Sequence, residues 1–147
     1  MQALHKDAEV YIADFKGGVD FPKVWHEKCR MCFTEEDLRY TLDQLVAVLE
    51  YRKSAFKALG CPNIDANNET TEQPLPRLIF ACDEVAEMLD KTGADNEREK
   101  LLSQIESMLS TIARQGRAFG IHLILATQRP DATIIPGQIR NNMDFRV

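Results

Sequence analysis

Residues 76–84, P-R-L-I-F-A-C-D-E, decide how the rest of the chain is interpreted. Five mostly apolar residues, 78–82, are followed at once by two carboxylates, Asp83 and Glu84. A short apolar run that ends in a polar turn is typical of a strand buried on both faces of a parallel sheet. Open α/β sheets bind their ligands at the carboxyl ends of such strands. The stretch therefore predicts a buried strand with two acids at the ligand-binding edge of a sheet.

Two interpretations of these acids are open from the nine residues alone. In the first, they form a Walker B motif, in which Asp83 holds the magnesium ion of a bound nucleotide and Glu84 polarises the attacking water. In the second, Asp83 only caps the following helix, a position that aspartate favours. The rest of the chain has to decide between them.

The composition is that of an ordinary folded domain, or of part of one. The 147 residues are 44% hydrophobic and 28% charged, and a chain of this length can bury a substantial core. No apolar run approaches the roughly 18 residues that cross a bilayer, and we find no signal peptide, so we expect a cytoplasmic chain. Any membrane anchor of a full-length protein would lie in other sequence.

The net charge of −5 argues against a free-standing DNA-coating module, but it allows contact with DNA through local basic residues.

The four cysteines leave two alternatives. Cys29 and Cys32 have C-x-x-C spacing and His26 lies three residues before them, so a zinc or redox site is conceivable. No second pair completes a four-ligand set, and Cys82 falls inside the predicted strand. We expect reduced cysteines, Cys61 included, with structural roles, as is usual in the cytosol.

Apolar runs alternate with helical patterns along the whole chain. Strands separated by long helices predict an α/β fold with a parallel sheet. Thr34 with Asp37 is typical of the start of one long helix, and Asp95 of another. Residues 63–76, which are polar and marked by prolines, predict a surface loop. The expected strands are 9–13, 29–33, 78–82 and 121–126, the expected helices begin near 34, 85 and 95, and a helical turn at 138–142 precedes the start of a strand at 145–147.

The second half of the chain contains four segments that are characteristic in sequence. They are L-I-F-A-C-D-E-V-A-E-M-L at 78–89, A-R-Q-G-R-A-F-G at 113–120, I-H-L-I-L-A-T-Q-R-P at 121–130 and P-G-Q-I-R-N-N at 136–142. In these segments the chain resembles the motor domain of FtsK/SpoIIIE-type DNA translocases, and T-Q-R-P after a buried strand is highly specific for that family.

The first half is similar to the same family in shorter segments. These are Y-I-A-D-F-K-G-G at 11–18, E-Y-R-K at 50–53 and A-L-G-C-P-N-I at 58–64. The segment D-F-K-G-G at 14–18 is more similar to the conjugative-element and secretion-associated branches of this family than to its other branches. We therefore treat residues 1–147 as one partial FtsK/SpoIIIE-like ATPase domain.

The resemblance implies a fold, cofactors and partners. The fold is that of a RecA-like P-loop NTPase, a three-layer sandwich around a parallel sheet. The cofactors are ATP and Mg²⁺. The partners are double-stranded DNA and further copies of the chain, which in this family form a hexameric ring around the DNA.

The resemblance also implies roles for individual residues. Asp83 matches the magnesium-linked Walker B acid and Glu84 the water-activating glutamate. Thr127 and Gln128 match the polar sensor that contacts the γ-phosphate. Arg52 is the first candidate for an arginine that acts on a neighbour's nucleotide, although a basic residue near a helix end is also favourable on its own. The other arginine candidates are Arg129, Arg140 and Arg146.

One half-site of the family is missing from the sequence. None of the seven glycines begins the phosphate-binding motif G-x-x-x-x-G-K-[ST], whose amides and lysine hold nucleotide phosphates. We therefore expect an incomplete, truncated motor domain that does not hydrolyse ATP measurably by itself. The alternatives are a non-catalytic, degenerate RecA-like assembly or interaction domain, and an unrelated α/β small-molecule binder.

A missing P-loop strand has a structural consequence. In the family that strand lies beside the strand expected at 121–126, so its absence leaves an apolar sheet edge exposed. Because exposed edges pair with other chains, we expect self-association along this edge or a reordered C-terminal segment.

Overall fold

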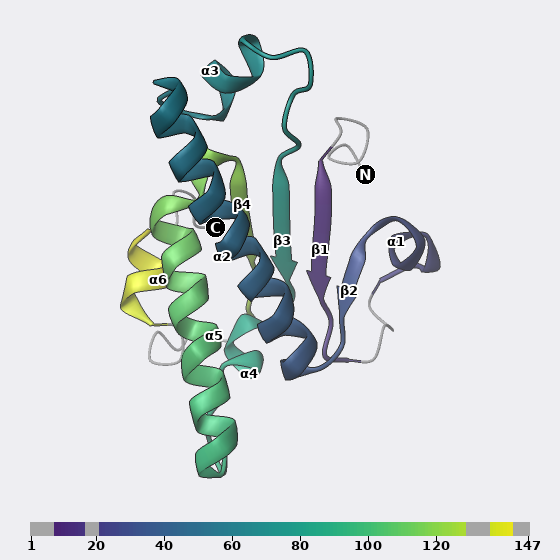
Figure 1. Cartoon of the computed structure of the whole chain (residues 1–147). Coiled ribbons are helices and arrows are strands. Elements are labelled where there is room, and N and C mark those ends of the chain that lie inside the picture. Colours follow the sequence, from purple (N-terminus) through teal and green to yellow (C-terminus); the bar gives the residue numbers. More distant parts are fainter. Residues whose placement is uncertain (1–7, 17–20, 129–135, 143–147) are drawn as a thin grey trace.

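A single parallel sheet forms the centre of the computed structural model, which describes residues 8–16, 21–128 and 136–142 (Figure 1). Its strands follow the order β2-β1-β3-β4, and each neighbouring pair is parallel. The predicted α/β class with a parallel sheet is therefore confirmed. The strand expected at 145–147 lies outside the described residues. The four strands are β1 Glu9–Ala13, β2 Arg30–Cys32, β3 Leu78–Cys82 and β4 Ile121–Leu125.

The strands β1, β3 and β4 end at the same level. Ala13 pairs with Cys82, and Cys82 pairs with Leu125, at the last position of each strand. Because the strands are parallel and in register, the residues that follow them gather at one edge of the sheet. This edge is the place where the sequence predicted a ligand site.

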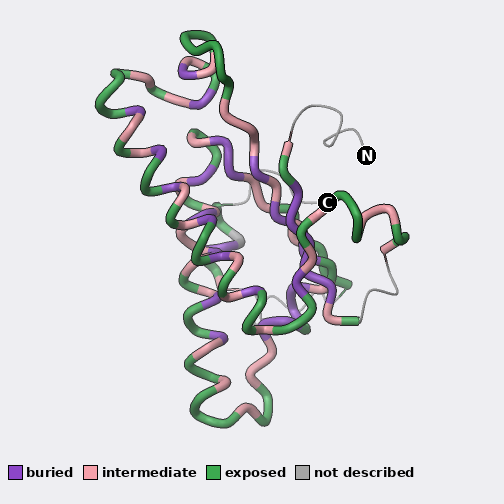
Figure 2. Tube along the Cα trace, turned by 45° about the vertical axis from the view of Figure 1, so that its right-hand side comes forward, coloured by how far each residue is buried: buried purple, intermediate pink, exposed green. Residues whose placement is uncertain are grey.

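Two long helices, α2 (Glu35–Leu59) and α5 (Asn96–Gln115), lie side by side across one face of the sheet (Figure 1). Apolar residues recur along each at helical spacing, which gives each one buried stripe. In Figure 2 the buried residues gather along the strands and on the helix sides that face inwards. The buried stripes are Leu38, Leu42, Leu45 and Leu49 from α2, and Leu102, Ile105, Leu109 and Ile112 from α5.

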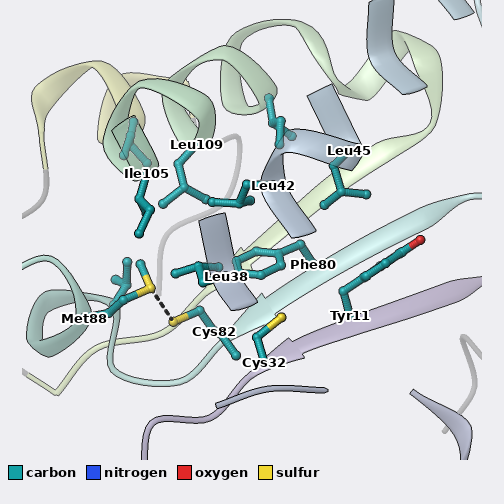
Figure 3. Packing of buried hydrophobic residues seen from close by; sticks show 14 of the residues in the cluster. Tyr11, Cys32, Leu38, Leu42, Leu45, Phe80, Cys82, Met88, Ile105 and Leu109 are labelled. Carbon is teal, nitrogen blue, oxygen red and sulfur yellow. Dashed lines mark hydrogen bonds between the residues drawn. The ribbon is translucent and has the colours of Figure 1, made fainter. Parts of the chain in front are cut away.

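The core lies between these helices and the sheet. Phe80, in the middle of β3, is fully buried there beside Leu38 and Leu42 (Figure 3). The sulfur atoms of Cys82 and Met88 lie 3.7 Å apart at the lower end of the same cluster (Figure 3). This packing fixes β3, and with it the turn that follows β3.

The N-terminal caps of both long helices were predicted correctly. The Asp37 backbone N–H donates to Thr34 Oγ1 at 3.1 Å, and the Thr34 N–H donates back to Asp37 Oδ2 at 3.3 Å, which makes a capping box. Asp95 Oδ1 accepts the Arg98 N–H at 2.8 Å at the start of α5. Gly60 ends α2 with a left-handed backbone at φ 67°.

The prediction of a loop at residues 63–76 was wrong for its first part. A short helix, α3 (Ile64–Glu69), begins there, and the Asn63 side chain caps it by accepting the Ala66 N–H at 2.9 Å. Ile64 is buried, so this segment is anchored to the fold. The remaining helices are α1 (Lys23–Lys28), which was not predicted, α4 (Val85–Met88) and α6 (Gly137–Asn141).

The strand β4 forms an edge of the sheet in the described part of the chain. Ile124 of β4 is 58% exposed, on the sheet face opposite to α5. The exposed apolar edge expected from the sequence is thus present among the described residues, and self-association along it stays a prediction. The helices α2 and α5 supply one helical layer of the predicted sandwich.

Over the ranges that the structure describes, no helix is long and apolar enough to span a bilayer.

Candidate functional site

Asp83 and Glu84 follow β3 at the carboxyl edge of the sheet. The Asp83 side chain is exposed, and no hydrogen bond or ion pair joins its carboxylate to another described residue. The residue at the N-cap of α4 is Glu84, and it makes no side-chain capping bond. The interpretation of Asp83 as a mere helix cap is therefore wrong, and its carboxylate is available to a ligand.

The Glu84 carboxylate is held by the end of β4. The Thr127 hydroxyl donates to Glu84 Oε1, and the Gln128 backbone N–H donates to Oε2 at 2.9 Å. The backbones are joined as well, because the Val85 N–H donates to the Ala126 carbonyl at 2.8 Å. The structure thus brings together Asp83, Glu84, Thr127 and Gln128, four of the five predicted site residues.

The Glu84 backbone is strained. Its φ of 59° and ψ of 56° are left-handed, and among the described residues no other non-glycine residue has positive φ. This conformation costs roughly 1–2 kcal/mol for a residue with a Cβ. Such strain persists where the surroundings enforce it, and it is typical of functional positions. Here the hydrogen bonds from Thr127 and Gln128 fix the carboxylate that the strained backbone presents.

A cleft of about 200 Å³ opens at these acids. Five carboxylates and two cationic side chains line it, so its charge is strongly negative. Such a cleft attracts a cation, and it repels nucleotide phosphates unless a cation accompanies them. The charged lining residues are Asp14, Lys16, Glu35, Asp83, Glu84, Glu87 and Arg98.

An ion pair in the lining of the cleft joins the starts of the two long helices. At the start of α5, Arg98 donates from Nε and Nη2 to Glu35 Oε1, at 3.0 and 2.9 Å, at the start of α2. The hydrogen bonds and the charge of Glu35 raise the pKa of Arg98. Since Glu35 already neutralises Arg98, this cation does little to offset the remaining acids of the cleft.

Asp14 is the site residue that the sequence analysis missed. It follows β1 and lines the same cleft as Asp83 and Glu84, and it is only 4% exposed. The sequence contains a signal for Asp14, because it directly follows a predicted strand, as Asp83 does. The glycine pair Gly17 and Gly18, which follows it in the sequence, lies outside the described residues.

Arg52 lies away from the acidic cleft of its own chain. It is buried in α2 and donates to the Phe119 carbonyl at 2.7 Å and to the Pro76 carbonyl at 2.8 Å. Phe119 precedes β4 and Pro76 precedes β3, so both carbonyls lie at the amino ends of the strands. Asp83 lies at the carboxyl end of β3, on the opposite side of the sheet. Burial lowers the pKa of Arg52. A role on a neighbour's nucleotide stays a prediction, and of the other candidates Arg129 and Arg146 lie outside the described residues, as does the side chain of Arg140.

The cysteines are free thiols, and two of them are part of the core. Cys32 Sγ lies 3.1 Å from Thr41 Oγ1, and burial raises the pKa of Cys82 to about 12. Both side chains pack against the face that α2 and α5 cover. These positions agree with the structural role that the sequence analysis favoured.

A second cleft, at the amino ends of β3 and β4, is positive on balance. Three arginines and His122 line it together with one acid, Asp65, which forms an ion pair with Arg77. The arginines are Arg77, Arg114 and Arg117. Burial lowers the pKa of His122, and the nearby charges of Arg77 and Arg117 lower it further. The amino edge of the sheet is therefore basic, whereas the carboxyl edge is acidic.

Comparisons with known proteins agree with the motifs. Residues 66–132 match the FtsK/SpoIIIE family. The DNA translocases FtsK of Staphylococcus aureus (strain Mu50 / ATCC 700699) and of Oceanobacillus iheyensis are each 33% identical over 116 residues, which cover 72% of this chain. The chain spans only 14% of the length of these relatives.

Solved structures add the fold. The structure of the pCW3 conjugation coupling protein TcpA, in monomer form with ATPγS, is 38% identical and superposes with a TM-score of 0.89, over 95% of this chain and 40% of TcpA. EssC from Geobacillus thermodenitrificans is 21% identical with a TM-score of 0.70, over 93% of this chain and 25% of EssC, and supports the fold alone. These neighbours are RecA-like P-loop ATPases, as the sequence predicted for the fold. Residues 66–132 thus match the FtsK/SpoIIIE family, and the chain is similar to the FtsK translocases and to TcpA over most of its own length.

Proposed function

We propose that this chain supplies the metal-binding and water-activating half of the ATP hydrolysis site of a DNA-translocating motor. One observation carries the proposal. A free carboxylate, Asp83, lies next to a carboxylate fixed by a neighbouring strand, Glu84, at the carboxyl edge of a parallel sheet. Ligands of open α/β sheets bind at this edge.

The residues divide the chemistry between them. Asp83 would hold Mg²⁺, which suits carboxylate oxygen and, when bound, neutralises phosphate charge. Glu84 would accept a proton from the attacking water, because its carboxylate is already oriented by Thr127 and Gln128. Gln128 follows β4, where its exposed side chain would contact the γ-phosphate.

The partners follow from the relatives. We infer that the full-length protein moves double-stranded DNA as a ring of identical subunits, and that the domain works in the cytoplasm, where ATP and DNA are available. The 38% identity with TcpA favours the conjugation-coupling branch over the chromosome-segregation branch. Because the net charge is −5, contact with DNA would depend on local basic residues rather than on the whole surface.

Nucleotide chemistry requires a phosphate-binding loop, and no such motif occurs in these 147 residues. We therefore predict that the chain alone hydrolyses no measurable ATP, whereas a form extended at its amino end by a P-loop segment does. In that extended form, Glu84→Gln should lower kcat by about 10²–10⁴-fold, the usual contribution of a general base. Glu87→Gln is the matched control, because it removes an exposed carboxylate from the same cleft.

The measurements are calorimetric titration of nucleotide and steady-state phosphate release. Robust Glu84-dependent turnover by the 147-residue chain alone would contradict the predicted inactivity. An active extended form in which Glu84→Gln and Glu87→Gln behave alike would contradict the role of Glu84. If an extended form with a P-loop neither binds nor hydrolyses nucleotide, the alternative of a non-catalytic assembly domain is favoured.

A further inference from the structure

A buried carboxylate oxygen in the acidic cleft is left without a partner. Asp14 Oδ1 accepts the Lys16 backbone N–H at 3.0 Å, whereas Asp14 Oδ2 is buried and has no hydrogen-bond partner among the described residues. Burying an unsatisfied charged oxygen is unfavourable, so it calls for an explanation. The turn formed with Lys16 explains Oδ1 alone, and an asparagine would form that turn equally well.

The position of Asp14 is fixed by the sheet. Its backbone N–H donates to the Cys32 carbonyl at 3.0 Å, which continues the pairing of β1 with β2. Because Ala13 is paired with Cys82, Asp14 and Asp83 follow adjacent strands at the same level. Both residues line the same cleft. The carboxylate of Asp14, with its unpaired oxygen, therefore lies at the wall of the cleft in which Asp83 would hold a cation.

The number of protein ligands in the cleft points to a water-mediated contact. Over residues 8–16, 21–128 and 136–142, no three His, Cys, Asp or Glu side chains are arranged to hold a metal ion directly. Mg²⁺ commonly binds through one or two carboxylates and keeps several of its waters. Carboxylates outside the direct ligand set orient such ligands by accepting their hydrogen bonds.

We propose that Asp14 is a positioning residue whose Oδ2 accepts a hydrogen bond from a water on the Mg²⁺ held by Asp83. This inference rests on the proposed function, because it requires Asp83 to hold the cation. Asp14 then fixes the orientation of the hydrated ion without being one of its direct ligands. The unfavourable burial of the carboxylate in the free protein is offset when the hydrated ion binds.

The test uses the full 147-residue chain and Mn²⁺, an ion with similar ligand preferences. Electron paramagnetic resonance measures free Mn²⁺ during titration, first with Mn²⁺ alone and then with ATPγS present. The variants are Asp14→Asn, Asp83→Asn and Glu87→Gln, and urea unfolding measures the stability of each. Glu87→Gln controls for the loss of one negative charge from the cleft.

We expect Asp14→Asn to be at least as stable as the wild type and to bind Mn²⁺ about 10–100-fold more weakly, the usual effect of losing such an outer partner. Glu87→Gln should change the affinity by less than about threefold, the modest loss expected for an exposed charge. Asp14→Asn that binds Mn²⁺ like Glu87→Gln, or that loses stability, overturns the inference. If Asp83→Asn weakens binding while Asp14→Asn does not, only the role of Asp14 fails. If Asp83→Asn binds like the wild type, or the wild type binds no Mn²⁺, the proposed metal role of Asp83 fails, and this inference fails with it.

Discussion

At the scale of single residues, Arg52 shows what a buried charge does for this fold. Its guanidinium joins α2 to the backbone just before β3 and just before β4, through the carbonyls of Pro76 and Phe119. Carbonyls shielded from water need donors, and these two partly buried carbonyls lie where regular strand pairing has not yet begun. Arg52 therefore fixes the amino ends of two neighbouring strands against the helix that covers them.

Replacing Arg52 by methionine should destabilise the protein. Arg52→Met keeps much of the side-chain volume but leaves two carbonyls without charged donors, so we expect the free energy of unfolding to fall by about 2–4 kcal/mol. Urea unfolding followed by far-ultraviolet circular dichroism measures this loss. The matched control is Arg39→Met, which removes an exposed ion pair with Asp43 from the same helix and should cost less than about 1 kcal/mol. Equal losses in both variants would show that the Arg52 contacts stabilise little.

The sequence contained a signal for this role. Arg52 follows Leu45 and Leu49 and precedes Phe56 at spacings of four, three and four residues, which place all four side chains on one face of a helix. The spacing predicts that Arg52 is buried. It does not identify Pro76 and Phe119 as partners, because those contacts depend on how α2 packs on the sheet. The same holds for Asp14. The sequence shows that it follows a strand, but only the structure shows that one of its carboxylate oxygens is buried without a partner.

At the scale of elements, the junction between α5 and β4 sets the position of the site. The chain leaves α5 through Gly116, which has helical dihedral angles, and a 3-10 helix, η2 (Arg117–Phe119), leads on towards β4. A Cβ added at Gly116 would lie 2.6 Å from the Ile121 carbonyl oxygen and 2.7 Å from that of Ile112. Both neighbours are backbone atoms, which cannot move without shifting the helix or the strand. This close approach determines where β4 begins, and therefore where Thr127 lies.

Gly116→Ala should consequently be costly. We expect the free energy of unfolding to fall by about 1–3 kcal/mol, the range for overpacked sites. Gly137→Ala at the start of α6 is the control, because nothing lies within 4 Å of the Cβ that it would add. Thermal unfolding of both variants measures the difference. A stable Gly116→Ala protein would show that the junction relaxes more readily than its contacts indicate.

Elements with strong local patterns were predicted well from the sequence. Both long helices have side-chain caps and continuous apolar stripes, and β1 and β3 were predicted with their observed bounds. The short helix α3 was missed because its six residues contain a single large buried apolar side chain, Ile64, which makes no periodic pattern. Its signal was the cap formed by Asn63, which the surrounding polar residues concealed.

At the scale of the whole molecule, β4 is an edge strand among the described residues, and this edge is the surface most prone to association. Ile124 projects from it with 58% of its surface exposed, and edge strands with apolar side chains pair with other chains. We predict that the isolated chain self-associates through this edge, and that Ile124→Lys lowers the association constant at least tenfold, because a charged side chain opposes edge pairing. Sedimentation velocity over a range of concentrations measures the association.

Tyr51→Lys provides the control for general solubility. Tyr51 is 70% exposed on α2, away from the edge, so its replacement adds the same charge without changing β4. Equal effects of the two substitutions would indicate that net charge, rather than the edge, governs association. A strictly monomeric wild-type chain would contradict the prediction altogether.

The class of the fold was predictable from the sequence, but the arrangement of its strands was not. Alternating strands and helices indicate a parallel sheet, whereas the order β2-β1-β3-β4 depends on where each crossover places the next strand. The proximity of Thr127 to Glu84 follows from the pairing of β3 with β4, which no local pattern predicts, since the two residues are 43 positions apart.

The shared level at which β1, β3 and β4 end has a thermodynamic consequence for ligand binding. Ala13, Cys82 and Leu125 are held by the hydrogen bonds of the sheet, so the residues directly after them are positioned when the chain folds. A site assembled from loops must lose conformational entropy when its ligand arrives. Here the acids are placed by strands, and most of the conformational entropy that binding would otherwise remove is already lost in folding.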